Sequence, residues 1–281
     1  MAYRTVLVQA DQTPDAAARM RLALGLAQSC QAHLTGVACT GVSRFASGDA
    51  AMQLPLVARQ WDHWRQLARS ALVSLDTLSR EAGLAAPTLR LLETDPEDGL
   101  MQLAPYHDLL VLSAASPEHA APGVLRDLPQ HLLLHTGRPL LLVPSAMAAE
   151  NTPRLPFLHP LLAWDGSAHA ARAISTALPL LKKAAAVTLL MLNPPAADPG
   201  HAVEAGADMA LMLARHGVRV EVMREYTTVD IGDALLCVAA ELCCDLLVMG
   251  GYGHRRGREA VLGGVTRSVM ADMTLPLLIT H

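Results

Sequence analysis

The chain contains the same pattern of apolar segments twice, and this internal repeat constrains its fold more than any other feature. Asp108-Leu-Leu-Val-Leu in the first half corresponds to Asp245-Leu-Leu-Val-Met in the second. A proline that opens a further apolar run follows each aspartate at the same distance of 31 residues, at Pro139 and Pro276. Equal spacing over a segment long enough to include a helix is hard to obtain by chance, so we infer a duplication.

The repeat predicts two domains of similar size. A length of 281 residues is about twice that of a typical domain, and we place the domains at residues 1–147 and 154–281. The polar, proline-bearing stretch Ala148–Pro156 serves as the linker. The distance from Asp11 to Asp108 in the first half is 97 residues, whereas the distance from Asp165 to Asp245 in the second half is 80. The first half therefore carries 17 more residues. We expect these extra residues around Thr40–Leu56, in the connection after the second strand.

Each half reads as five apolar strands that alternate with helical stretches. The runs are continuous rather than alternating, which is typical of strands covered by helices on both faces of a parallel sheet. The strand-helix order favours right-handed crossovers and a doubly wound sheet. The sequence therefore predicts an α/β protein of two tandem, Rossmann-like domains, each with a doubly wound, five-stranded parallel sheet. The predicted strands are 5–10, 33–39, 88–93, 108–113, 139–143, 160–165, 186–192, 218–224, 245–249 and 275–280.

Composition narrows the classes of partner. The net charge is −4, so no basic excess is present to hold a nucleic acid. We find neither a secretory signal nor an apolar run of membrane-spanning length, and we expect a cytoplasmic protein without a membrane partner. The five cysteines lack a CxxC pair, which indicates reduced, buried thiols. A redox role for Cys243-Cys244, in a helical pattern, stays open.

One glycine-rich loop carries the candidate chemistry. After the strand 245–249 the chain reads Gly250-Gly-Tyr-Gly253, and a second glycine pair, Gly263-Gly264, opens a helix predicted over Val265–Asp272. Glycines let the backbone turn sharply and approach a ligand, and free amides at a helix start favour phosphate. Asp165 ends the first strand of the same half, so it belongs at the same edge of the sheet, where it can accept from a ribose or a base. No GKS or GKT follows the glycines, which excludes a P-loop.

Simpler interpretations of the same residues stay open. The glycine loop can be a tight connection without ligand, and Asp165 can start a turn in which Ser167 caps the next helix. The basic run His254-Arg-Arg with Arg258 can contact a triphosphate or be a solvated loop. His131 and His135 lie four apart on a predicted helix but lack an acidic or thiol partner nearby in the sequence, so we assign no metal site.

The spacing of Gly250, Gly253 and Gly263, with the strand that ends in Asp165-Gly-Ser, resembles the ATP-binding signature of the universal stress protein family. The resemblance covers nearly the full chain as two copies and is sharpest in the second. It implies the adenine nucleotide alpha hydrolase-like fold, bound ATP, and room for a divalent ion such as Mg²⁺. It also implies that two domains pack across their fifth strands, as an internal pseudo-dimer that can dimerise again. The implied nucleotide-binding residues are Asp165, Gly166, Ser167, Leu192, Met249, Gly250, Gly253, Gly263, Gly264, Val265 and Thr266.

Both halves depart from the family pattern. The family usually has Ser or Thr directly after its third glycine, where this chain has Gly264. A lost hydrogen bond to a charged group costs about 1.5–3 kcal/mol, or roughly ten- to a hundredfold in affinity, which Thr266 or Ser268 can offset in part. In the first half every matching position has changed, so we predict no ATP there and assign Asp11 to a turn or cap. The replacements are Ser113, Ser116, Arg126, Asp127 and Pro129.

The leading hypothesis is therefore a cytoplasmic stress-response module, regulated by ATP bound in its second half, with an unidentified protein partner. We identify no catalytic residues, because no nucleophile and general base can be paired from the sequence. Slow hydrolysis at most is expected. The alternatives are a nucleotide-dependent hydrolase or adenylyl-transfer enzyme, and a ligand-free tandem that binds a partner.

Overall fold

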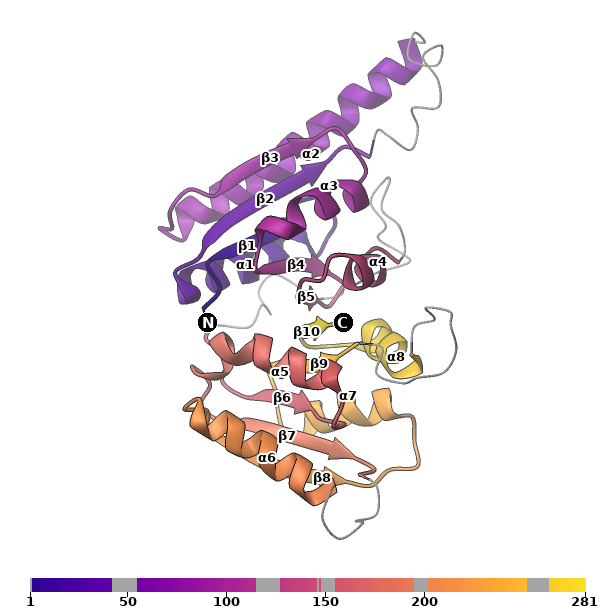
Figure 1. The fold of residues 1–281 in the computed structure, drawn as a ribbon. Coiled ribbons are helices and arrows are strands. Elements are labelled where there is room, and N and C mark those ends of the chain that lie inside the picture. The colour runs from indigo at the N-terminus through magenta and orange to yellow at the C-terminus, as the bar shows by residue number, and fades with distance from the viewer. Residues whose placement is uncertain are drawn as a thin grey trace. The chain divides into compact units, whose positions relative to one another are not determined.

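The structure is a computed structural model that describes residues 2–41, 55–114, 127–145, 147, 155–194, 202–251 and 263–281. In the helices that begin at residues 55 and 202, side chains are described from residues 59 and 206 onward. Its contacts divide the chain into two compact units (Figure 1). The N-terminal unit is mainly Tyr3–Arg138. The C-terminal unit is mainly Pro153–His281, joined by Pro139–Pro144.

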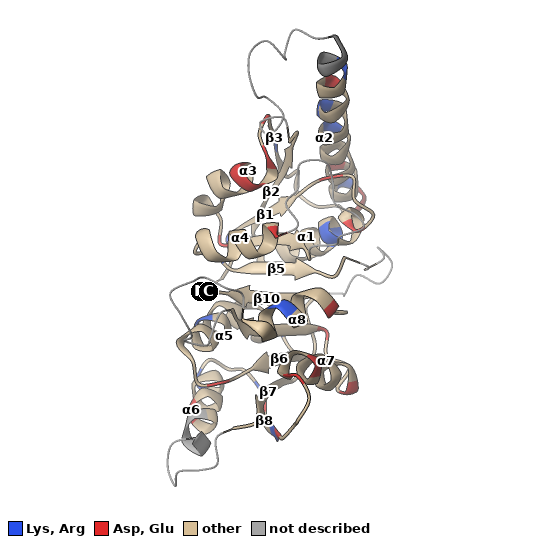
Figure 2. Cartoon of the chain, turned by 90° about the vertical axis from the view of Figure 1, so that its right-hand side faces the viewer, with Lys and Arg blue, Asp and Glu red and all other residues tan. Residues whose placement is uncertain are grey.

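The N-terminal unit has a parallel sheet with the strand order β3-β2-β1-β4. Helices α1 and α2 contact these strands and each other, while α3 and α4 pack together on the other face (Figure 2). Right-handed crossovers from a central first strand produce this division. The elements are β1 (Thr5–Gln9), α1 (Ala16–Cys30), β2 (His33–Cys39), α2 (Pro55–Glu81), β3 (Thr88–Leu92), α3 (Pro96–Leu103), the 3-10 turn η2 (Ala104–Tyr106), β4 (Leu109–Ser113) and α4 (Leu128–His135).

The C-terminal unit repeats this plan with the parallel order β10-β9-β6-β7-β8. Helix α5 packs on β9 and β10, α6 packs on β7 and β8, and α7 packs against α8. The elements are β6 (Pro160–Ala163), α5 (Ala168–Leu181), β7 (Val187–Leu192), α6 (Ala202–Arg215), β8 (Val220–Glu225), α7 (Ile231–Glu241), β9 (Leu246–Gly250), α8 (Gly264–Asp272) and β10 (Leu277–Thr280).

Strand β5 (Leu140–Val143) belongs to the first half by sequence but to the C-terminal unit by its contacts. It pairs antiparallel with β10, and Leu141 lies opposite Leu278. The sheet of the C-terminal unit therefore includes an antiparallel strand that comes from the other repeat.

The strands form for the reason the sequence suggested. In the central strands the apolar runs are buried, as in β1, where Val6, Leu7 and Val8 are fully buried, and in β6, where Leu161 and Leu162 are, whereas the outer strands β3 and β8 are partly exposed. Helices on both faces leave no solvent side, so no polar alternation is needed. The predicted class, two tandem α/β domains with mostly parallel sheets, is confirmed.

The repeated aspartates have the same task in both units. The carboxylate of Asp108, just before β4, accepts from the amides of Arg4 and Thr5 at 2.7 and 3.0 Å. Asp245, just before β9, accepts from the amides of Leu158 and His159 at 2.5 and 3.0 Å. Each carboxylate thus connects the residue just before one central strand, β4 or β9, to the chain at the beginning of the neighbouring strand, β1 or β6. This contact gives a physical reason for the repeated motif.

The extra length of the first half lies mostly in a helix rather than in the loop we expected. Helix α2 has 27 residues, whereas its counterpart α6 has 14. Residues 42–54, which make up most of the predicted insertion, fall outside the described residues.

All five cysteines are free thiols, but the expectation that they are buried is wrong for Cys237 and Cys243, which are exposed. The pair Cys243-Cys244 also lies beyond the end of α7 rather than within a helix, and Cys243 adopts a left-handed backbone with φ of 51°. Among the residues that the structure covers, none of the helices combines the length and apolarity that crossing a membrane requires.

Candidate functional site

A cavity of about 600 Å³ opens at the carboxyl ends of β6, β7 and β9, beside the start of α8. This is the edge at which an open parallel sheet binds ligands. Eight of the eleven predicted site residues line it, although they come from four separate segments: Asp165, Leu192, Met249, Gly250, Gly263, Gly264, Val265 and Thr266. Gly166 and Ser167 do not line the cavity, and Gly253 lies outside the described residues.

Asp165, Gly166 and Ser167 form the turn that joins β6 to α5. Asp165 accepts from the amide of Ser167 at 2.9 Å through one carboxylate oxygen. Gly166 has φ of +77°, where a side chain would strain the backbone. Ser167 caps α5, because its hydroxyl accepts from the amide of Ala170 at 3.1 Å. The turn interpretation of Asp165 is thus correct, and the same residue also lines the cavity.

Gly250 ends β9 where the strand meets the first turn of α5. A Cβ at this position would lie 2.6 Å from the amide nitrogen of Ala170 and from the carbonyl carbon of His169. Both atoms are backbone and cannot rotate away. Gly250 is therefore needed for close packing of strand and helix, in addition to shaping the cavity wall.

The start of α8 presents backbone amides to the cavity. Gly263 is the N-cap of this nine-residue helix and, as a glycine, has no side chain to accept a hydrogen bond from the first turn. Thr266 is buried and lines the cavity. Ser268, considered in the sequence as a substitute hydroxyl, instead donates to Asp233 of α7 at 3.2 Å. Only Thr266 of the two can face a ligand here.

Several cavity residues were missed from the sequence. Trp164 is nine-tenths buried, and its indole nitrogen has no hydrogen-bond partner within the described parts of the chain. Asp230 caps α7 by accepting from the amide of Gly232 at 2.8 Å. An aspartate just before an apolar helical run is a recognisable cap signal, but its place in the same cavity as Asp165 depends on the fold. The other unpredicted lining residues are Ala163, Ala170, Leu190, Met191, Asn193, Pro194, Ile231 and Leu235.

The charged side chains that line the cavity, within the described segments, are the carboxylates of Asp165 and Asp230. Most of the remaining wall is aliphatic. The basic run from His254 to Arg258 lies outside the described residues. The side chains of the described lining therefore suit an uncharged, largely apolar group that brings hydrogen-bond donors, whereas the start of α8 offers backbone amides.

One of the two histidines of α4, His131, has an acidic neighbour that the sequence argument missed. The Nε2 of His131 lies 3.0 Å from Glu97 of α3, which is distant in sequence, and its ring stacks on His135. In the part of the chain that the structure describes, no group of three or more His, Cys, Asp or Glu side chains is placed to hold a metal ion.

A sequence model of the universal stress protein family matches residues 159–281, from just before β6 to the C-terminal residue. The C-terminal domain belongs to this family. A search of curated protein sequences gives no match.

Solved structures extend the likeness in fold to the full chain. A universal stress protein from Archaeoglobus fulgidus DSM 4304 matches with a TM-score of 0.71 and 16% identity, over 98% of this chain and 95% of that one. A protein of Pseudomonas aeruginosa UCBPP-PA14, described as a universal stress protein, matches with a TM-score of 0.58 and 16% identity, over 99% and 93%. Both repeats therefore share the universal stress protein fold.

The first repeat lacks the features that shape the cavity in the universal stress protein domain. Ser113 stands where β9 has Gly250, and Asp127 is the N-cap residue of α4, the counterpart of α8. Pro129 follows in the first turn of α4. Ser116 and Arg126 lie outside the described residues. Beside Asp11 a pocket of only about 60 Å³ opens.

Proposed function

We propose that this protein is a stress-response module that binds one adenine nucleotide, ATP, in the cavity of its C-terminal domain. Membership of that domain in the universal stress protein family supports the stress-response class. The observation that carries the proposal is the meeting of eight predicted residues from four segments around one cavity. A volume of about 600 Å³ is within the range of roughly 300–1,000 Å³ typical of small-molecule sites.

Two parts of the cavity lining suit two parts of a nucleotide. The aliphatic wall formed by Leu190, Leu192 and Met249 accommodates a flat base. Asp165 uses one carboxylate oxygen within its own turn, so the other remains to accept from a ribose hydroxyl or a base amine. The backbone amides at the start of α8 and its helix dipole favour phosphate.

Gly264 limits the affinity of this site. Its amide can contact a phosphate, but the hydroxyl of the usual Ser or Thr is missing, which lowers affinity by roughly ten- to a hundredfold. We therefore expect ATP to bind in the micromolar to millimolar range rather than to co-purify in full. An accompanying Mg²⁺ would be held mainly by the phosphates themselves.

The test begins with the purified protein. Any nucleotide released on denaturation is identified by mass spectrometry, and the stripped protein is then titrated with ATP. The matched control is Gly264→Asp, which reproduces Asp127 of the first repeat. A Cβ at Gly264 meets no atom within 4 Å, and an acidic residue suits the first turn of a helix, so the variant should fold while repelling phosphate.

Binding by the wild type with loss in Gly264→Asp is the expected result. No binding at millimolar ATP would contradict the proposal and favour a ligand-free, partner-binding tandem. Rapid release of inorganic phosphate by the wild type would instead favour the hydrolase alternative.

A further inference from the structure

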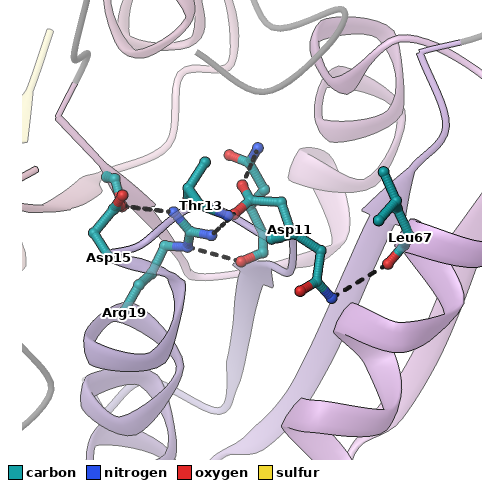
Figure 3. A network of polar contacts seen from close by, with 8 residues as sticks. Asp11, Thr13, Asp15, Arg19 and Leu67 are labelled. Atoms are coloured by element: carbon teal, nitrogen blue, oxygen red, sulfur yellow. Dashed lines mark hydrogen bonds and ion pairs between the residues drawn. The ribbon is translucent and has the colours of Figure 1, made fainter. Parts of the chain in front are cut away.

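The N-terminal unit holds a buried arginine at the site that corresponds to the cavity. Arg19 of α1 is 1% exposed, and its guanidinium reaches the carboxyl end of the sheet (Figure 3). Its Nε donates to the carbonyl of Gln9 at 2.8 Å, and its Nη1 donates to the hydroxyl of Ser113 at 2.5 Å. Nη2 forms an ion pair with Asp11 at 2.8 Å, and Nη1 forms one with Asp15 at 3.3 Å.

The partners of Arg19 are the counterparts of the cavity wall. Matching the acidic residues Asp11 and Asp165 places Gln9 on Ala163, and matching the repeated aspartates places Ser113 on Gly250. Ala163, Asp165 and Gly250 all line the cavity of the C-terminal domain. One guanidinium therefore connects the same three positions that surround an open space in the other repeat.

The residue that matches Arg19 in the second repeat is Ala173, which is fully buried in α5. Its short side chain cannot reach the end of the sheet. Gly250 likewise presents no side chain, and its backbone sits directly against α5. The first repeat thus joins helix α1 to strand β4 through an arginine and a serine. The second repeat joins the corresponding helix α5 to the corresponding strand β9 with an alanine and a glycine at these positions.

We infer that Arg19 is a resident cation that closes the N-terminal counterpart of the cavity, so that this unit takes no ligand at this edge of its sheet. The guanidinium provides the hydrogen-bond donors that a ligand would otherwise bring to Asp11, and it adds a positive charge that pairs with this carboxylate. The guanidinium needs no external partner, because it is paired with the carboxylates of Asp11 and Asp15 and donates to Gln9 and Ser113. The chain is therefore built with one repeat permanently closed, whatever the other repeat binds.

The pKa of Asp11 agrees with this arrangement. Burial disfavours the charged carboxylate, but the charge of Arg19 and the two hydrogen bonds from Thr13 outweigh it and hold the pKa below its usual value. The carboxylate is therefore ionised and paired at neutral pH. Within the described residues, a pocket of about 60 Å³ lies beside it, lined in part by Cys39 and Thr40.

Cys39 provides a native reporter of the closed state. Burial, with the nearby charges of Asp95 and Asp98, raises the pKa of its thiol to about 12, so it should react slowly with alkylating reagents. We would measure its labelling rate with iodoacetamide by peptide mass spectrometry in the wild type and in Arg19→Ala. The exposed Cys237, in the C-terminal unit, is the internal control.

Opening of the crevice predicts labelling of Cys39 at least about tenfold faster in Arg19→Ala, with Cys237 unchanged. Methylguanidinium at low millimolar concentration should fill the vacated space and slow the reaction again. Unchanged Cys39 labelling in the folded variant would overturn the inference, as would acceleration that methylguanidinium does not reverse.

If Arg19→Ala fails to fold, the milder Arg19→Lys variant decides. Lysine keeps the charge and the alkyl stem but cannot reach all four partners, because it carries one ammonium instead of a planar fork. Faster labelling of Cys39 than in the wild type is expected, and an unchanged rate would overturn the inference.

Discussion

Replacing Gly250 by alanine should destabilise the C-terminal unit through a steric clash that its neighbours cannot relieve. The added Cβ would lie 2.6 Å from two backbone atoms of α5 and 2.8 Å from the Cβ of His169. Overpacking of this kind costs about 1–3 kcal/mol. Displacing the start of α5 would also weaken the cap between Ser167 and Ala170, worth about 1 kcal/mol. We therefore expect a loss of about 2–4 kcal/mol in the free energy of unfolding.

The matched control is Gly264→Ala in the same cavity. A Cβ at Gly264 meets no atom within 4 Å, and the residue opens α8, so alanine should change stability by less than about 1 kcal/mol. Urea unfolding followed by hydrogen exchange of α5 and β9 peptides reports on this unit separately, which matters because two-domain chains need not unfold in one step. Equal stability of Gly250→Ala and the wild type would refute the close-approach argument.

Three further predictions concern other parts of the molecule. Ser167→Ala should lower the stability of the C-terminal unit by about 1 kcal/mol through loss of the α5 cap, while Ser167→Asp should retain it; urea midpoints that do not separate the two would contradict the cap. The N-terminal unit should lose stability as the pH falls below about 4, because Asp11 and Asp108 have lowered pKa values in the folded state. Burial opposes the ionisation of both carboxyl groups. For Asp11 this effect is outweighed by the charge of Arg19 and hydrogen bonds from Thr13, and for Asp108 by hydrogen bonds from amides and a hydroxyl. Hydrogen exchange between pH 6 and 3 checks this, and Asp108→Asn should flatten the dependence. Gly264→Ser restores the missing hydroxyl in open space and should raise ATP affinity by about tenfold or more in calorimetry; an unchanged affinity would place the phosphates elsewhere.

Much of the fold could be predicted because its determinants are local and repeated. Continuous apolar runs located all ten strands, and β7 (Val187–Leu192) differs from its predicted range by one residue at its start. The length of α2 escaped prediction because its sequence carries no stop signal that separates a longer helix from an inserted loop. The place of β5 beside β10 depends on contacts between segments far apart in the chain, which no local pattern records.

The candidate site was predictable where backbone geometry left a signature in residue type. Glycines and a strand-end aspartate pointed to residues that meet at one cavity. Trp164 and Asp230 were missed because tryptophan in an apolar run and aspartate before a helix have common structural uses. Arg19 was missed for a different reason. An arginine within an alanine-rich helix reads as a solvated residue, and only the fold brings Asp11, Asp15 and Ser113 around it.

The central claim is that the cavity of the C-terminal domain holds the nucleotide. Calorimetric titration of ATP into the wild type, Gly264→Ser and Gly264→Asp tests it most directly, because a Cβ at Gly264 meets no atom within 4 Å and both substitutions should leave the fold intact. We predict one site per chain, with the tightest binding in Gly264→Ser, weaker binding in the wild type and none in Gly264→Asp. Equal affinity in all three proteins, or two sites per chain, would contradict the claim.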